Sequence, residues 1–180
     1  MRFLVPLLSV ALVAPLLSAY AQYDDQLAQA VALYKSASRG ERGEVERAIA
    51  AFEALARRDP SQPLYGAYLG SAMALRGRDA WMPWNRIRHT EEGLERIDQA
   101  LAALRPVHDS QLLRGVPVAL ETKLVAGMTY IKLPDSVFHR RAAGVKLIQE
   151  LLRHPALAAA PAEFRAAVNR ASETVRETSR

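Results

Sequence analysis

The stretch AIAAFEALARRDPSQPLYGAYLGSAMALRGR, residues 48–78, decides the fold. It holds two apolar blocks with helical spacing, separated by Asp59-Pro60, a pair that ends a helix. In the first block the small Ala48 is followed by the bulky Phe52 one helical turn later. Such pairs let two helices approach closely while the larger side chain fills the neighbouring groove. The stretch therefore predicts two helices that pack tightly against their neighbours.

The same small-before-bulky pattern returns twice more along the chain. It recurs as Gly93-x3-Ile97-x2-Ala100 and as Gly144-x3-Ile148-x2-Leu151. Glycine and proline fall between the blocks, and no block shows sustained strand-like alternation. The predicted helices span residues 23–38, 43–58, 62–77, 89–105, 117–133, 137–153 and 161–177. We therefore predict an all-α fold of about three antiparallel helix pairs, with a C-terminal helix that covers the open end of the stack.

Residues 45–77 resemble the tetratricopeptide repeat, a helix–turn–helix unit with a period of about 34 residues. The matching positions are Ala48, Phe52, Pro60, Leu69, Gly70, Ala72 and Gly77. The 22 residues from Ala48 to Gly70 equal the family's own spacing, whereas the other spacings are longer. The resemblance implies that residues 22–180 form one degenerate tetratricopeptide-like domain, an α-α superhelix.

The family binds its ligands along a concave surface made by the first helix of each pair. The resemblance therefore implies that Tyr68 and Ser71 contact a partner, with Glu121 and Lys132 flanking such positions on a later first helix. An apolar groove of this kind suits a helix or an extended peptide. Two alternatives stay open: the groove is free for a partner, or the chain's own C-terminal helix fills it.

Both tryptophans of the chain, Trp81 and Trp84, lie beside Arg86 and Arg88. They fall in an eleven-residue excess between the two helices of the second pair, which we interpret as an insertion into the turn, with Pro83 at the start of a short helix. Packing is the first interpretation, because two buried rings would anchor the insertion. A recognition patch is the second, because tryptophan and arginine are enriched in binding hot spots.

The N-terminal residues MRFLVPLLSVALVAPLLSAYA, 1–21, have the layout of a secretory signal peptide. Arg2 precedes an apolar run, and small residues stand at the −3 and −1 positions of a cut after Ala21. Because the run is shorter than a membrane span and no second one follows, we predict a periplasmic protein without a stable membrane span after cleavage.

No motif for catalysis, metal binding or cofactor binding is present. The four histidines are scattered, there is no cysteine, and no glycine-rich loop is spaced to hold phosphate. The chain has 24 basic against 19 acidic residues, a mildly positive balance, and because we predict that it is exported we expect no nucleic-acid partner. We predict a non-enzymatic scaffold or adaptor for a protein or peptide in the bacterial cell envelope. The alternative is a module that binds an apolar small molecule or lipid in the helical groove.

Overall fold

The computed structural model describes residues 14–178, and its fold is all-α, as predicted. The long helices are α1 (Ala14–Ser38), α2 (Glu44–Arg58), α3 (Pro63–Asp79), α4 (Pro83–Ala102), α6 (Val118–Lys132), α8 (Arg141–Arg153) and α9 (Ala162–Thr178). The short elements are α5 (Val107–Ser110), β1 (Leu112–Leu113), β2 (Val116–Pro117), α7 (Asp135–Phe138) and the 3-10 helix η1 (Pro155–Leu157). Each predicted helix has a counterpart, except that the one predicted over residues 137–153 is divided between the end of α7 and α8.

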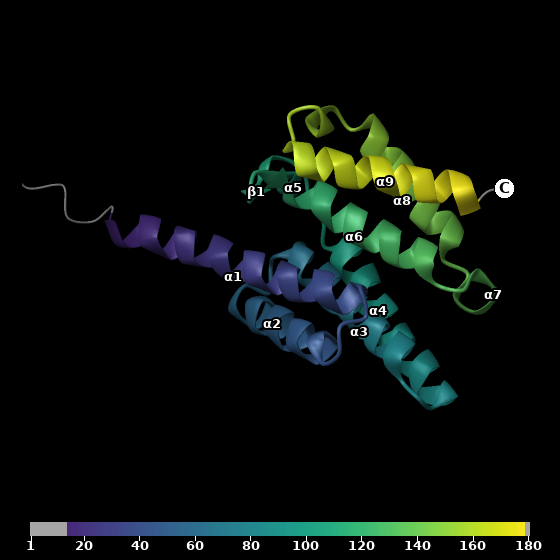
Figure 1. Ribbon diagram of the computed structural model, residues 1–180. Coiled ribbons are helices and arrows are strands. Elements are labelled where there is room, and N and C mark those ends of the chain that lie inside the picture. Colours follow the sequence, from purple (N-terminus) through teal and green to yellow (C-terminus); the bar gives the residue numbers. More distant parts are fainter. Residues whose placement is uncertain (1–13, 179–180) are drawn as a thin grey trace, which may run out of the picture.

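The long helices pack as three hairpins, α1 with α2, α3 with α4 and α6 with α8 (Figure 1). Helix α2 packs on α3, and α6 packs mainly on α3 rather than on α4. The backbones of α3 and α4 meet at Gly70 and Gly93, and those of α6 and α8 meet at Gly127 and Gly144. Gly93 and Gly144 belong to the small-before-bulky pattern, which therefore marks where the helices touch.

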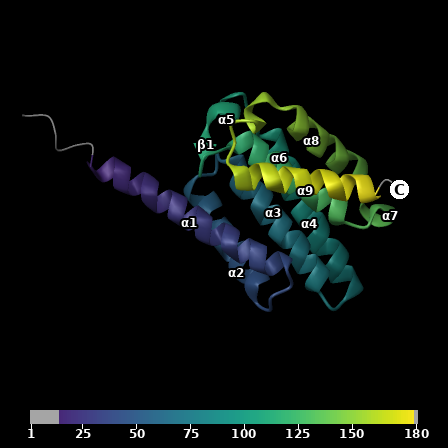
Figure 2. The same cartoon turned by 45° about the horizontal axis from the view of Figure 1, so that its top comes forward.

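Residues 78–89 do not form an insertion in the turn, contrary to the prediction. Helix α3 continues to Asp79, and α4 begins at Pro83 and runs without a break to Ala102. Proline at the first helical position sacrifices no hydrogen bond, because the N–H groups of the first turn have no partner within the helix. The extra residues therefore lengthen both helices, and the α3–α4 hairpin projects beyond the other two (Figures 1 and 2).

A minimal β-hairpin, which the sequence analysis did not predict, lies between α5 and α6. Leu113 pairs with Val116 across a turn whose two residues, Arg114 and Gly115, have φ values of 52° and 76°. Positive φ at both central residues is the geometry of a tight hairpin turn. The turn brings the side chain of Arg114 over the first turns of α6.

The predicted signal peptide lies mostly outside the described residues, which begin at Ala14. Helix α1 runs continuously through the predicted cleavage site after Ala21. In residues 14–178, no helix is long and apolar enough to cross a membrane.

Candidate functional site

The first helices of the three hairpins, α1, α3 and α6, are joined by a chain of hydroxyl groups. Tyr34 Oη lies 2.6 Å from Ser71 Oγ, which lies 2.7 Å from Thr129 Oγ1. Thr129 donates to the carbonyl oxygen of Val125, so Ser71 donates to Thr129 and Tyr34 donates to Ser71. Ser71 is therefore buried where three helices meet, and its hydroxyl proton is already donated within the chain.

Tyr68 is also buried, and its hydroxyl donates a hydrogen bond to Glu121 Oε1 at 2.7 Å. Arg114, held by the turn of the β-hairpin, donates to the same carboxylate oxygen. The Tyr68 ring stacks on Phe52 of α2 with a centroid distance of 4.7 Å. Tyr68 therefore locks α3 to α2 and α6 and is not available to a partner. The reason is that α6 packs directly on α3 and leaves no open surface between them at this position.

Alkaline pH is expected to destabilise the fold through these tyrosines. Burial raises the pKa of Tyr34, and burial together with the Glu121 carboxylate raises the pKa of Tyr68 well above its usual range. The folded state holds these protons more tightly than the unfolded state, so their stabilisation is complete below about pH 10 and is lost as pH rises above it. Urea unfolding at about pH 8 and about pH 11 measures this loss. Tyr68→Phe should show a smaller loss, and an unchanged loss would contradict the assignment.

An apolar groove of about 600 Å³ opens where the projecting α3–α4 hairpin faces the C-terminal end of α6 and helix α7. Its floor contains the hydroxyl chain of Tyr34, Ser71 and Thr129. Since each of these hydroxyl protons is already donated within the chain, the floor offers no free donor. The apolar lining side chains are Ala74, Leu75, Pro83, Ile87, Met128, Leu133, Pro134, Val137 and Phe138.

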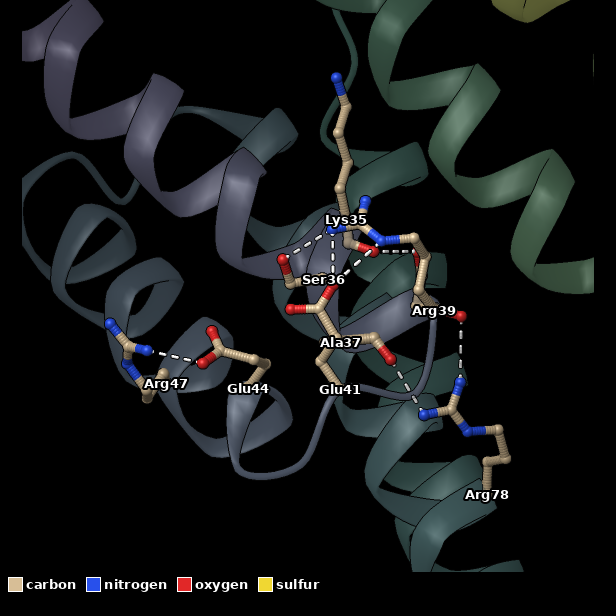
Figure 3. Close-up of polar contacts among 9 residues, drawn as sticks. Lys35, Ser36, Ala37, Arg39, Glu41, Glu44, Arg47 and Arg78 are labelled. Atoms are coloured by element: carbon tan, nitrogen blue, oxygen red, sulfur yellow. Dashed lines mark hydrogen bonds and ion pairs between the residues drawn. The ribbon is translucent and has the colours of Figure 1, made fainter.

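Three basic side chains line this groove. Arg78 donates to the carbonyl oxygens of Ala37 at 3.0 Å and Ser38 at 3.3 Å, so it caps the C-terminus of α1 (Figure 3). It also pairs with Asp79, whereas Arg86 donates only to the backbone carbonyl of Ala80. In the described part of the chain, neither Arg86 nor Lys132 has a carboxylate partner. The groove therefore carries uncompensated positive charge at Arg86 and Lys132.

A second hollow of about 340 Å³ lies on the other side of α7. Val137 and Phe138 line both hollows, so the two adjoin across this short helix. The second hollow contains Glu91, Glu95 and Asp98 from α4. Asp98 pairs with Arg140, whereas Glu91 and Glu95 have no basic partner among residues 24–177. The two adjoining hollows of this two-part groove thus carry opposite charge, positive in the first and negative in the second, and share the apolar side chains of Val137 and Phe138.

The tip of the α3–α4 hairpin carries Trp81 and Trp84, which are 83% and 64% exposed. The packing interpretation is therefore wrong for both rings. Most of the extra residues are part of α3 and α4, so there is no inserted loop for the rings to anchor. Neither tryptophan lines the groove, and Arg88 contacts Asn85 and Glu92 on its own helix. Of the six predicted partner-binding residues, Ser71 and Arg86 line the groove, Trp81, Trp84 and Arg88 are at the exposed tip, and Tyr68 is buried away from both.

The C-terminal helix does not fill the groove. Phe164, Val168 and Ala171 of α9 join a core cluster with Ile148 and Leu151 of α8. Helix α9 thus covers the α6–α8 hairpin, on which it packs, and the alternative in which it occupies the groove is wrong.

Sequence reasoning missed the half of the groove that α7 supplies. The helix predicted over residues 137–153 includes Val137 and Phe138, whereas the structure places them in the separate helix α7, which follows Pro134 and ends before α8 begins at Arg141. The only local signal was Pro134-Asp135-Ser136, which indicates a helix start but not what the helix faces.

The described residues contain no group of three or more histidine, aspartate or glutamate side chains that could hold a metal ion. Comparison of the chain with family models, with curated proteins and with solved structures finds no match. The geometry of the groove and of the tip is therefore the basis for a functional proposal.

Proposed function

We propose that this protein is a non-enzymatic scaffold that binds a polypeptide partner in the cell envelope. A segment of the partner lies in the two-part groove, with apolar side chains beside Val137 and Phe138. The observation that carries the proposal is the charge of the groove, which is positive at Arg86 and Lys132 and negative at Glu91 and Glu95.

The two signs of charge favour a polypeptide over a lipid. A fatty acid or phospholipid offers an apolar body with its charge at one end, so it matches the positive hollow but gains nothing from the acidic one. A polypeptide can place acidic, apolar and basic side chains in succession along one segment. Charge complementarity of this kind fixes the register of a partner and speeds its association.

The arrangement of the hairpins supports a degenerate tetratricopeptide-like array as the scaffold. The motif over residues 45–77 and the glycine contacts within the second and third hairpins are features such an array would have. The packing of α6 on α3 departs from a regular superhelix, and this departure closes the usual concave surface and moves the groove to the α7 end. The signal-like N-terminal sequence supports the periplasm as the location.

Site-specific photocrosslinking in living cells tests the proposal. Benzoylphenylalanine at Val137, which is 52% exposed between the two hollows, is expected to give an adduct with one polypeptide. The same probe at Leu112 serves as the control, because this side chain is 58% exposed but lies near the opposite end of α6.

The charge pattern is tested by combining the Val137 probe with Lys132→Glu or with Glu91→Lys. Both side chains are exposed, so the fold should tolerate each change. Each variant is expected to lower the adduct yield several-fold, because it replaces an attraction between the groove and a charged side chain of the partner by a repulsion. A yield unaffected by both changes, or an equal yield at Leu112, would contradict the polypeptide groove.

A lipid or apolar small molecule is the second candidate occupant. The volume of the first hollow, about 600 Å³, lies within the range of small-molecule sites, and apolar side chains dominate its wall. In this case the adduct at Val137 would have the mass of the protein plus a lipid. Its yield would fall with Lys132→Glu but not with Glu91→Lys.

A further inference from the structure

We infer that the tip of the α3–α4 hairpin docks on the surface of an anionic lipid bilayer. The tip comprises residues 80–88. It consists of the three-residue turn between α3 and α4 and the first residues of α4. This inference goes beyond the polypeptide groove, because Trp81, Trp84 and Arg88 lie outside the groove lining.

The exposed side chains of the tip are those found at membrane interfaces. Trp81 and Trp84 are mostly exposed, and Ile87 is partly so. Tryptophan is enriched at the level of lipid headgroups, where its ring meets the acyl boundary and its N–H stays near water. At the lower end of the view in Figure 1 the turn between α3 and α4 extends beyond the other two hairpins, so the tip can meet a flat surface on that side before they do.

The charge around the rings suits an anionic surface. Residues 80–88 contain two arginines, Arg86 and Arg88, and no acidic residue, while Arg76 one turn before the end of α3 is paired with Glu46. Asp79 is already paired with Arg78, and the Arg86 guanidinium donates only to a backbone carbonyl. Glu92, one turn further along α4, faces Arg88 at 4.0 Å and His89 at 3.3 Å and so offsets part of this charge. The net balance of the tip remains positive, which attracts anionic headgroups.

The size of the tip argues against a protein as its partner. Two tryptophan rings bury at most about 500 Å² together, because each offers about 150–250 Å². A stable protein interface buries about 800 Å² on each side and centres on a well-packed pocket. A bilayer needs no such pocket, since it accepts single apolar side chains that protrude from a convex surface.

Tryptophan fluorescence provides the test, because the chain has two tryptophans and both are in the tip. The full chain is mixed with vesicles of phosphatidylglycerol and phosphatidylethanolamine, or of phosphatidylcholine alone. We expect a blue shift of the emission and cosedimentation with the anionic vesicles, both weakened by salt. Phosphatidylcholine vesicles should give neither.

Variants separate the tip from the rest of the surface. Arg88→Glu, which leaves the groove lining unchanged, is expected to lower the vesicle partition coefficient by about tenfold. Trp81→Ala with Trp84→Ala should abolish cosedimentation while leaving the melting temperature unchanged, because neither ring is packed. Reversal of one exposed arginine elsewhere, Arg170→Glu, is the matched control for charge and should cost less than Arg88→Glu.

Three results would overturn the inference. The first is an emission spectrum that anionic vesicles leave unchanged. The second is equal loss of binding in the tip variants and the control variant. The third is a blue shift with vesicle-free envelope proteins but not with vesicles, which would assign the tip to a protein partner. Because none of these readouts involves the Val137 crosslink, their failure leaves the proposed groove standing.

Discussion

Replacing Gly93 with alanine is expected to lower the free energy of unfolding by about 3 kcal/mol, near the upper end of overpacking costs. A Cβ atom on Gly93 would lie 2.4 Å from the carbonyl oxygen of Gly70 and 2.8 Å from the amide nitrogen of Ala74. Both neighbours are backbone atoms of α3, so a rotamer change cannot relieve the clash. Helix propensity alone predicts the opposite sign, a gain of about 1 kcal/mol. The sign of the change thus reports the close approach of the two helices.

Gly66→Ala is the matched control for this prediction. It lies in α3 and would place its Cβ near a single atom, the Cβ of Ala100 at 3.3 Å. We expect a change of less than about 1 kcal/mol, because helix propensity offsets the tight contact. Urea unfolding of both variants provides the comparison. Equal stability of the Gly93→Ala variant and the unmodified protein would show that α3 and α4 do not meet at these glycines.

Replacing Glu121 with methionine is expected to cost about 3–5 kcal/mol, the effect of removing one member of a buried ion pair. The variant leaves the Arg114 guanidinium partly buried without its carboxylate and leaves the Tyr68 hydroxyl without its acceptor. The loss should be partly recovered when Arg114 is also replaced by methionine, because the second change removes the unpaired charge.

Glu150→Met is the matched control for Glu121→Met. Glu150 pairs with Lys123 at 3.1 Å, but both side chains are partly exposed. Pairs of this kind contribute about 1 kcal/mol or less. A Glu121→Met variant that loses no more stability than Glu150→Met would contradict the buried network. It would also be contradicted if the losses of Glu121→Met and Arg114→Met simply added in the variant that carries both changes.

The long helices and their points of contact could be predicted from the sequence because both depend on local patterns. Prolines and glycines mark the helix ends, and Pro83 begins a helix as expected. The glycines that recur before bulky residues, Gly93 and Gly144, are the positions at which the backbones touch. In each case the physical cause acts within a few residues of the pattern.

The burial of Tyr68 and the exposure of the tryptophans could not be predicted from the sequence. Whether Tyr68 faces a groove depends on the position of α6, and α6 begins 50 residues further along the chain. The spacing of the tetratricopeptide repeat predicts an inserted loop at the tryptophans, because it implies shorter helices on either side. In the structure, the extra residues instead extend α3 and α4. The groove itself depends on α7, which the sequence pattern did not separate from the helix predicted over residues 137–153.

The most direct test of the central claim is the mass and sequence of the adduct formed at Val137. We predict a single polypeptide attached through a segment in which apolar residues are flanked by acidic side chains on one side and basic side chains on the other. An adduct of lipid mass, or attachment to many unrelated proteins at levels equal to the Leu112 control, would contradict it.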